Sequence, residues 1–245
     1  GAVMYFTVPV DATAIEKRAY FTVANGSMLQ NNKVLMVESP IADALAMGIS
    51  PQESKGSMIV NIGAQSTELS VIAGGKVIIS KSLQLGGMKM DEGIISEIRK
   101  NYNLHLGRRT AHRLKTAVGR LNTQSKEARK VVGIDSVSGL PREETVSSVV
   151  VNEGISSCVD EIAKEIKTFL ERTPPQIAYQ IAQEGIYLTG GSTRLPFIES
   201  YLGNDTGYSF KLSGLYEQCT IQGLEKIIQD SGLQQWASPI RQRKL

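Results

Sequence analysis

Residues 58–72 read Met-Ile-Val-Asn-Ile-Gly-Ala-Gln-Ser-Thr-Glu-Leu-Ser-Val-Ile. Two apolar runs flank a short polar turn at residues 63–67, a pattern typical of a β-hairpin. Residues 77–83 repeat the apolar pattern after a Gly-Gly pair, so we expect a third strand and an antiparallel meander. A tight turn of small residues after a buried strand can present backbone N–H groups to a phosphate. The stretch therefore predicts a sheet and, at its turn, a candidate anion site.

A second stretch, residues 185–195, has the same organisation. A short apolar strand at residues 186–189 runs into Gly-Gly-Ser-Thr and then into a predicted helix at residues 195–202. Glycine allows a ligand to approach the backbone closely, and the N-terminus of a helix favours anions. Either loop alone is a weak indication because many turns have this composition. A simple strand-to-helix turn stays open as the alternative for the second loop.

The remaining pattern mixes strands and helices. The N-terminal part reads strand, helix, strand, helix over residues 4–10, 13–24, 33–37 and 39–48, which favours parallel strands. Later segments are helices that begin near residues 91, 110 and 152, short strands within residues 122–146, a strand at 208–212 and a helix at 217–229. Residues 50–56 are either a hinge or an ordinary surface loop. The pattern predicts an α/β fold.

Composition excludes several classes of protein. The 245 residues are 41% hydrophobic, enough for a sizeable core, and a net charge of +3 is too small to indicate a nucleic-acid partner. Cys158 and Cys219 have neither disulfide-framework nor metal-site spacing, so we expect them unjoined in a reduced cytoplasm. No apolar run approaches the ~18 residues of a membrane span. The first residues lack the basic flank of a signal peptide and open directly into a strand, so the natural start is expected further upstream.

Taken in order, these motifs resemble the actin/chaperone/sugar-kinase ATPase superfamily, and within it the bacterial actin MreB, or rod shape-determining, family. That family's second phosphate loop, Asp-Ile-Gly-Gly-Gly-Thr-Thr-Glu, matches residues 61–68 in frame, and its Leu-Thr-Gly-Gly adenosine loop matches residues 188–191. Further matches in family order are Val8-Pro9 with Glu16-Lys17-Arg18-Ala19, Glu38-Ser39-Pro40, Gly86-Gly87 with Asp91-Glu92, Asn101-Tyr102, Arg113-x-Lys115, Pro174-Pro175 and Cys219-x-x-x-Gly223. The likeness runs from about residue 4 to about residue 230.

The resemblance implies an actin-like ATPase (ribonuclease H-like) fold of two lobes with a nucleotide between them. Residues 1–56 would be the end of the first lobe, residues 57–87 and 148–230 the core of the second, residues 88–147 an inserted small subdomain, and residues 231–245 a flexible tail. The family's first phosphate loop, Asp-x-Gly-Thr, has no counterpart in this sequence. The tail carries Trp236 and three basic residues, and membrane contact is the alternative interpretation of it.

The resemblance also implies which residues would contact ATP bound with magnesium. The candidate contacts are Asn61, Gly63, Ala64, Gln65, Ser66, Thr67, His112, Lys115, Gly190, Gly191, Ser192 and Thr193. Asn61 replaces the family Asp that helps to hold magnesium through water, while Ala64 and Gln65 replace two glycines. These changes predict a weakened phosphate cradle in which Ser66 and Thr67 still offer hydroxyls, or else a plain hairpin. No metal ligand is predicted.

Two further positions bear on chemistry. The catalytic Glu of the family corresponds to Ser39, a poor water-orienting base, so we predict no catalytic residue and interpret Ser39 as a helix cap. The Arg113-x-Lys115 helix is where the family touches adenine and ribose, with His112 in place of a Glu. The alternative is an ordinary solvated helix face.

The expected function is that of a cytoplasmic, filament-forming cytoskeletal or scaffold protein in cell-shape determination, with weak or lost ATP binding and hydrolysis. An active ATPase whose first lobe is missing from this chain, and a chaperone-like assembly factor, are the alternatives. Partners would be other copies of the chain or other cytoskeletal proteins. We expect contacts through apolar residues of the insert, namely Leu104, Leu106, Val131, Val132 and Ile134. Without the first lobe, association should be weak.

Overall fold

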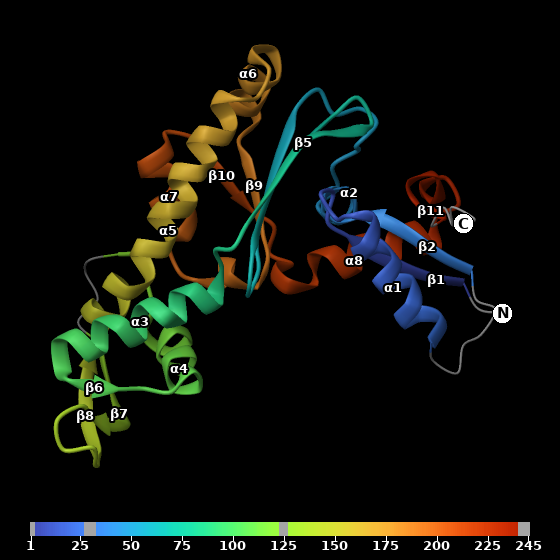
Figure 1. The fold of residues 1–245 in the computed structure, drawn as a ribbon. Helices are drawn as coiled ribbons and strands as arrows, with labels where there is room; N and C mark the ends of the chain where they lie inside the picture. The colour runs from blue at the N-terminus through green and yellow to red at the C-terminus, as the bar shows by residue number, and fades with distance from the viewer. Residues whose placement is uncertain (1–2, 27–32, 123–126, 240–245) are drawn as a thin grey trace.

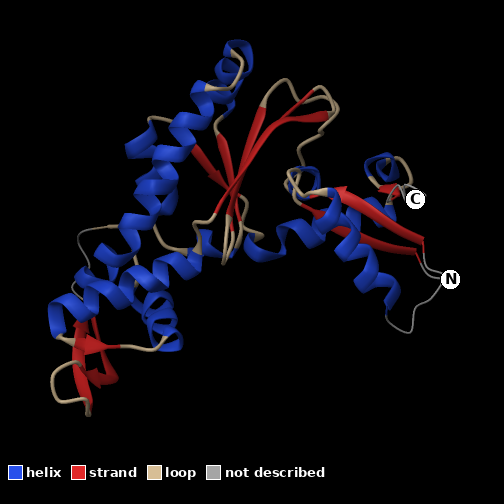
Figure 2. Ribbon diagram, in the orientation of Figure 1, coloured by secondary structure: helices blue, strands red, loops and turns tan. Residues whose placement is uncertain are grey.

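The computed structural model describes residues 3–26, 33–122 and 127–239, and within them three sheets are flanked by helices (Figures 1 and 2). The β1 sheet contains β1 (Val3–Val8), β2 (Lys33–Glu38) and β11 (Ser238–Pro239), in the order β1-β2-β11. The central sheet has the order β10-β9-β3-β4-β5, from β3 (Ser57–Ile62), β4 (Thr67–Ala73), β5 (Lys76–Leu83), β9 (Ile186–Thr189) and β10 (Phe210–Leu212). The small sheet contains β6 (Leu104–His105), β7 (Ala128–Asp135) and β8 (Pro141–Ser147).

The central sheet confirms the predicted meander, because β3, β4 and β5 pair antiparallel in sequence order. Strand β9 adds in parallel on the other side of β3. Alternate residues of a strand point to opposite faces, and β3 is buried on both. Met58 and Val60 join the larger apolar cluster, whereas Ile59 joins a second cluster. Burial on both faces explains why the strand reads as an almost continuous apolar run.

One face of the central sheet is covered by the predicted helix α5 (Ser148–Glu171), whose buried residues recur at spacings of three and four. The helix begins at Ser148 rather than near residue 152, since the Ser147 hydroxyl accepts a hydrogen bond from the Val149 amide and caps it. The other helices on this side are α3 (Gly87–Tyr102), α4 (Arg108–Val118), α6 (Pro175–Glu184) and α7 (Ile198–Thr206). The small sheet lies beyond α3 and α4, at the opposite end of the molecule from α6 (Figure 1).

The β1 sheet confirms the expected parallel pairing of its first two strands. Its helices are α1 (Ala14–Gly26), which starts with a capping box of Thr13 and Glu16, and α2 (Ser39–Ala46). The interpretation of Ser39 as the helix cap is wrong. The N-cap residue of α2 is Glu38, whose side chain makes no capping hydrogen bond, and Ser39 is the first residue of the helix.

Helix α8 (Cys219–Gln229) differs from the predicted division, which placed it in the second-lobe core. It packs on α2, and the two helices share the second apolar cluster with Ile59 of the central sheet. Glycine at position 223 allows this close crossing, since a Cβ there would lie 1.8 Å from the Ala42 carbonyl oxygen.

Residues 231–239 were expected to be a flexible tail, but the structure gives them secondary structure. A 3₁₀ turn at Leu233–Trp236 and strand β11, antiparallel to β2, follow α8. Leu233 and Trp236 pack against the second apolar cluster, and burial of such large side chains favours an ordered segment. The basic residues Arg241, Arg243 and Lys244 lie outside the described residues.

Cys158 and Cys219 are both buried and unjoined, which confirms the prediction for them. No helix in the described part of the chain is both long and apolar enough to cross a membrane.

Candidate functional site

The two loops singled out in the sequence lie side by side. Strands β3 and β9 are parallel neighbours, so the loops that follow them emerge at the same edge of the central sheet. The Ser192 hydroxyl donates to the Gly63 carbonyl oxygen at 2.8 Å, and the Gly87 amide donates to the same oxygen at 3.0 Å. The backbone of the first loop is therefore held by the second loop and by the start of α3.

A pocket of about 490 Å³ opens between these loops and helix α4. Several of the predicted residues line it together: Ala64, His112, Lys115, Gly191 and Ser192. Its volume lies within the range of small-molecule sites, roughly 300–1,000 Å³. The structure thus brings the second loop and the Arg113-x-Lys115 helix to one cavity.

Lys115 is a buried residue of this pocket, only 9% exposed, so the interpretation of its position as a solvated helix face is wrong. Its ammonium group lies 2.8 Å from Asp91 Oδ1 and donates to the Gly87 carbonyl oxygen. His112, which is largely exposed, lies 3.3 Å from the other Asp91 oxygen. Asp91 was predicted only as a helix start, and its role as partner of Lys115 was missed.

Of the two hydroxyls that were expected to face a phosphate, those of Ser66 and Thr67, the Thr67 hydroxyl is engaged elsewhere. Thr67 is fully buried, and its hydroxyl donates to the Leu85 carbonyl oxygen at 2.7 Å. Thr193 is also buried and donates to the Gly190 carbonyl oxygen at 2.7 Å. Ser66 is half-buried, and its carbonyl oxygen closes the turn by accepting from the Gly63 amide. The expectation of free hydroxyls is therefore wrong for Thr67.

The two glycines of the second loop have different roles. Gly190 has φ +94°, and a Cβ there would lie 2.4 Å from the Ile62 carbonyl oxygen, so the turn itself requires glycine. A Cβ at Gly191 would meet nothing closer than Glu217 at 3.5 Å. Gly191 thus leaves open space at the pocket, which suits close approach of a ligand. Gln65, in the first loop, is exposed.

Buried carboxylates lie behind the first loop. Asn61 Nδ2 donates to Asp43 Oδ2 at 2.8 Å, and the Thr220 hydroxyl donates to Asp43 Oδ1 at 2.6 Å. Burial raises the pKa of Asp43 to about 6, which leaves it mostly ionised above neutral pH. Glu68 is paired with Asn61 across the β3–β4 ladder. Burial, and then the nearby Asp43 charge, raises the pKa of Glu68 to about 7.

No local pattern indicated this cluster of Asp43, Asn61, Glu68 and Thr220, because its members come from α2, β3, β4 and α8. The pair Arg194–Glu217 at the rim of the pocket was also missed: Arg194 Nε and Glu217 Oε2 are 2.8 Å apart, and the guanidinium lies over the Tyr216 ring. Within the described ranges, no three His, Cys, Asp or Glu side chains are arranged to hold a metal ion.

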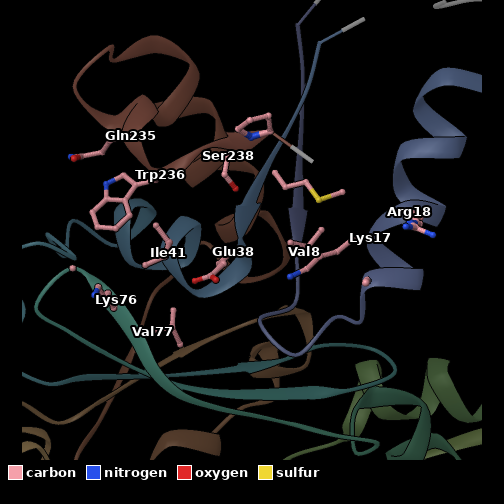
Figure 3. Close-up of a pocket in the computed structure, with 14 residues that line it drawn as sticks. Val8, Lys17, Arg18, Glu38, Ile41, Lys76, Val77, Gln235, Trp236 and Ser238 are labelled. Carbon is pink, nitrogen blue, oxygen red and sulfur yellow. The ribbon is translucent and has the colours of Figure 1, made fainter. Parts of the chain in front are cut away.

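A second pocket, of about 740 Å³, lies between α1, the β1 sheet and the β4–β5 turn (Figure 3). The indole of Trp236 borders it near Ile41 and Val77, and the Glu38 carboxylate faces its interior (Figure 3). Burial raises the pKa of Glu38, an effect that nearby Lys17 opposes. Trp236 thus closes one side of this pocket.

The family model described as MreB/Mbl protein matches residues 2–235. The chain belongs to the MreB/Mbl family. The cell shape-determining protein MreB of Escherichia coli (strain K12) is 35% identical over 202 residues, which are 82% of this chain and 57% of that protein. The chain therefore spans little more than half the length of that relative.

Solved structures agree on the fold. MreB5 of Spiroplasma citri bound to AMPPNP matches with a TM-score of 0.88 and 27% identity, over 95% of this chain and 69% of that one. The MamK double helical filament matches with a TM-score of 0.72 over 93% of this chain and 69% of that one, and its 17% identity shows the fold alone. The predicted actin-like fold and membership of the MreB family are confirmed.

The two sides of the pocket differ in the groups that they present. Gly191 and Lys115 both line the pocket, and a Cβ at Gly191 would meet nothing closer than 3.5 Å. At the first loop, Ala64 and Gln65 are exposed side chains where the family has glycine, and the Thr67 hydroxyl is turned inward.

Proposed function

We propose that this chain is part of a cytoplasmic, actin-like cytoskeletal protein of the MreB type, acting in cell-shape determination with weak ATP binding and little or no hydrolysis. The observation that carries the proposal is the pocket between the two loops and α4, combined with a phosphate side that lacks its usual groups. Ser39, at the start of α2, has no carboxylate with which to orient a water molecule. An active ATPase remains the second candidate, favoured by the intact adenosine side of the pocket.

The proposal includes self-association, and the structure changes the surface expected for it. Leu104 and Leu106 are fully buried and Val131 is 9% exposed, so these three cannot form a contact surface. By contrast, four residues at the end of the small sheet are exposed and apolar. They are Val132, Ile134, Val137 and Leu140, with exposed fractions of 61, 44, 88 and 65%. We call them the hairpin patch.

The occupant proposed for the hairpin patch is a second copy of the chain. Val132 and Ile134 lie on β7, and Val137 and Leu140 lie in the turn between β7 and β8. Figure 1 shows these strands at the opposite end of the molecule from α6, where an end-to-end contact could form. The apolar stripe of α5 is already buried in the core, so it offers no competing surface. Exposed apolar groups gathered in one place favour an interaction surface.

Sedimentation velocity over a concentration series tests this surface. We expect weak, concentration-dependent association, and Leu140→Asp should raise the dissociation constant by about tenfold or more, because a charge would be desolvated at the contact. Tyr179→Asp, at a comparably exposed position on α6, is the matched control and should leave association unchanged. An oligomer whose mass is independent of concentration, or equal effects of both changes, would contradict the proposal.

A further inference from the structure

Asp43 is a buried charge without a cationic partner. It is 1% exposed, and no ion pair to it is present among the described residues. Among the described residues, its carboxylate accepts hydrogen bonds from the Asn61 amide and the Thr220 hydroxyl, with a further contact from Cys219. A buried carboxylate with only neutral donors is costly, and such groups are frequent at functional sites. This cost indicates that Asp43 has a role other than packing.

The contact fixes which way the Asn61 amide faces. An ionised carboxylate is an acceptor only, so the amide must present its nitrogen to Asp43 and turn its oxygen away. The oxygen then lies against the second loop, since a Cβ at Gly190 would be 2.5 Å from Asn61 Oδ1. The orientation follows from the chemistry of the donor and acceptor, and it places a carbonyl oxygen between the two loops.

Asn61 and Asp43 also depend on each other through charge. An Asp at position 61 would set two carboxylates within hydrogen-bond distance, opposite Glu68 on β4, and like charges at that separation cannot all remain ionised. An amide at position 61 is therefore the side chain compatible with a carboxylate at position 43. The negative charge behind the amide also makes its oxygen a better acceptor.

We propose that Asp43 and Asn61 together replace the single Asp that opens this loop in the family, with Asp43 as the positioning residue that aims the Asn61 oxygen at the hydrated divalent cation of a bound nucleotide. The inference rests on the proposed nucleotide site. Divalent cations of this kind prefer oxygen ligands and retain several waters, which suits a neutral carbonyl oxygen backed by a remote charge. The weak binding of ATP by this chain should then still depend on magnesium.

The test compares magnesium dependence with stability in the same variants. ATP titrations followed by NMR give one dissociation constant for ATP in EDTA and another in magnesium. The measured quantity is the ratio of the first constant to the second. We expect a ratio of about five or more in the unaltered chain, falling to about two or less in Asp43→Asn. In the exchanged variant Asn61→Asp/Asp43→Asn, the carboxylate sits at the loop, and the ratio should exceed that of the unaltered chain. Asp205→Asn, an exposed carboxylate on α7, is the matched control.

Thermal unfolding separates this role from a structural one. Removing a buried charge should leave Asp43→Asn at least as stable as the unaltered chain at pH 8, so its loss of magnesium dependence cannot come from unfolding. A ratio unchanged in Asp43→Asn, with binding retained, would overturn the inference and leave the nucleotide site standing. No binding of ATP by any variant would overturn the proposed site and the inference together.

Discussion

Gly223→Ala is expected to lower the free energy of unfolding by about 3 kcal/mol, at the upper end of the usual cost of overpacking. A Cβ at position 223 would lie 1.8 Å from the Ala42 carbonyl oxygen and 2.4 Å from its carbon. Backbone atoms cannot yield as the end of a flexible side chain does, so α8 must move away from α2. The shift would also separate Thr220 from Asp43, since each lies on one of these helices.

Chemical denaturation measures the effect, with Gln222→Ala as the matched control on the same helix. Gln222 is half-buried and its side-chain hydrogen bond to Gln218 is exposed, so its replacement should leave the unfolding free energy nearly unchanged. If Gly223→Ala were as stable as Gln222→Ala, the close packing of α2 on α8 described here would be wrong.

Lys115→Met is expected to destabilise the chain by about 3–5 kcal/mol, because it leaves the buried Asp91 carboxylate without its main partner. His112, at 3.3 Å, is too exposed to compensate. Replacement of both partners, Lys115→Met with Asp91→Leu, should recover most of the loss, since an apolar pair leaves no uncompensated charge. The unfolding free energies of the two single variants and the double variant give the interaction energy between Lys115 and Asp91.

The exposed pair of Lys130 and Glu143, also 2.8 Å apart, supplies the control for that cycle. Water screens this pair, so Lys130→Met should leave the stability unchanged within error. Additive effects of Lys115→Met and Asp91→Leu would show that the two side chains do not interact in the folded protein.

Local patterns predicted most of the fold. The alternation of apolar runs and tight turns predicted β3, β4 and β5, and spacings of three and four predicted α5, because both signals are contained in neighbouring residues. The position of α8 could not be obtained this way. Its contact with α2 joins segments far apart in the chain and depends on the shape of Gly223 rather than on hydropathy.

The candidate site shows the same limit. Composition indicated two loops and the Lys115 helix, and the structure brings them to one pocket. The sequence could not predict which hydroxyls are free to bind a ligand. Thr67 follows the loop as in the family, yet its hydroxyl donates a hydrogen bond to the Leu85 carbonyl oxygen. Asp43 was likewise unremarkable in the sequence, since only folding places it beside Asn61.

Calorimetric titration of the chain with magnesium and ATP tests the central claim most directly. The loss of several charge-assisted contacts, about 1.5–3 kcal/mol each, predicts a dissociation constant weaker than roughly 100 μM. Ala64→Trp, at an exposed position on the rim of the pocket, should fill the cavity and abolish this weak binding. A dissociation constant in the low micromolar range, or binding that Ala64→Trp leaves unchanged, would contradict the account.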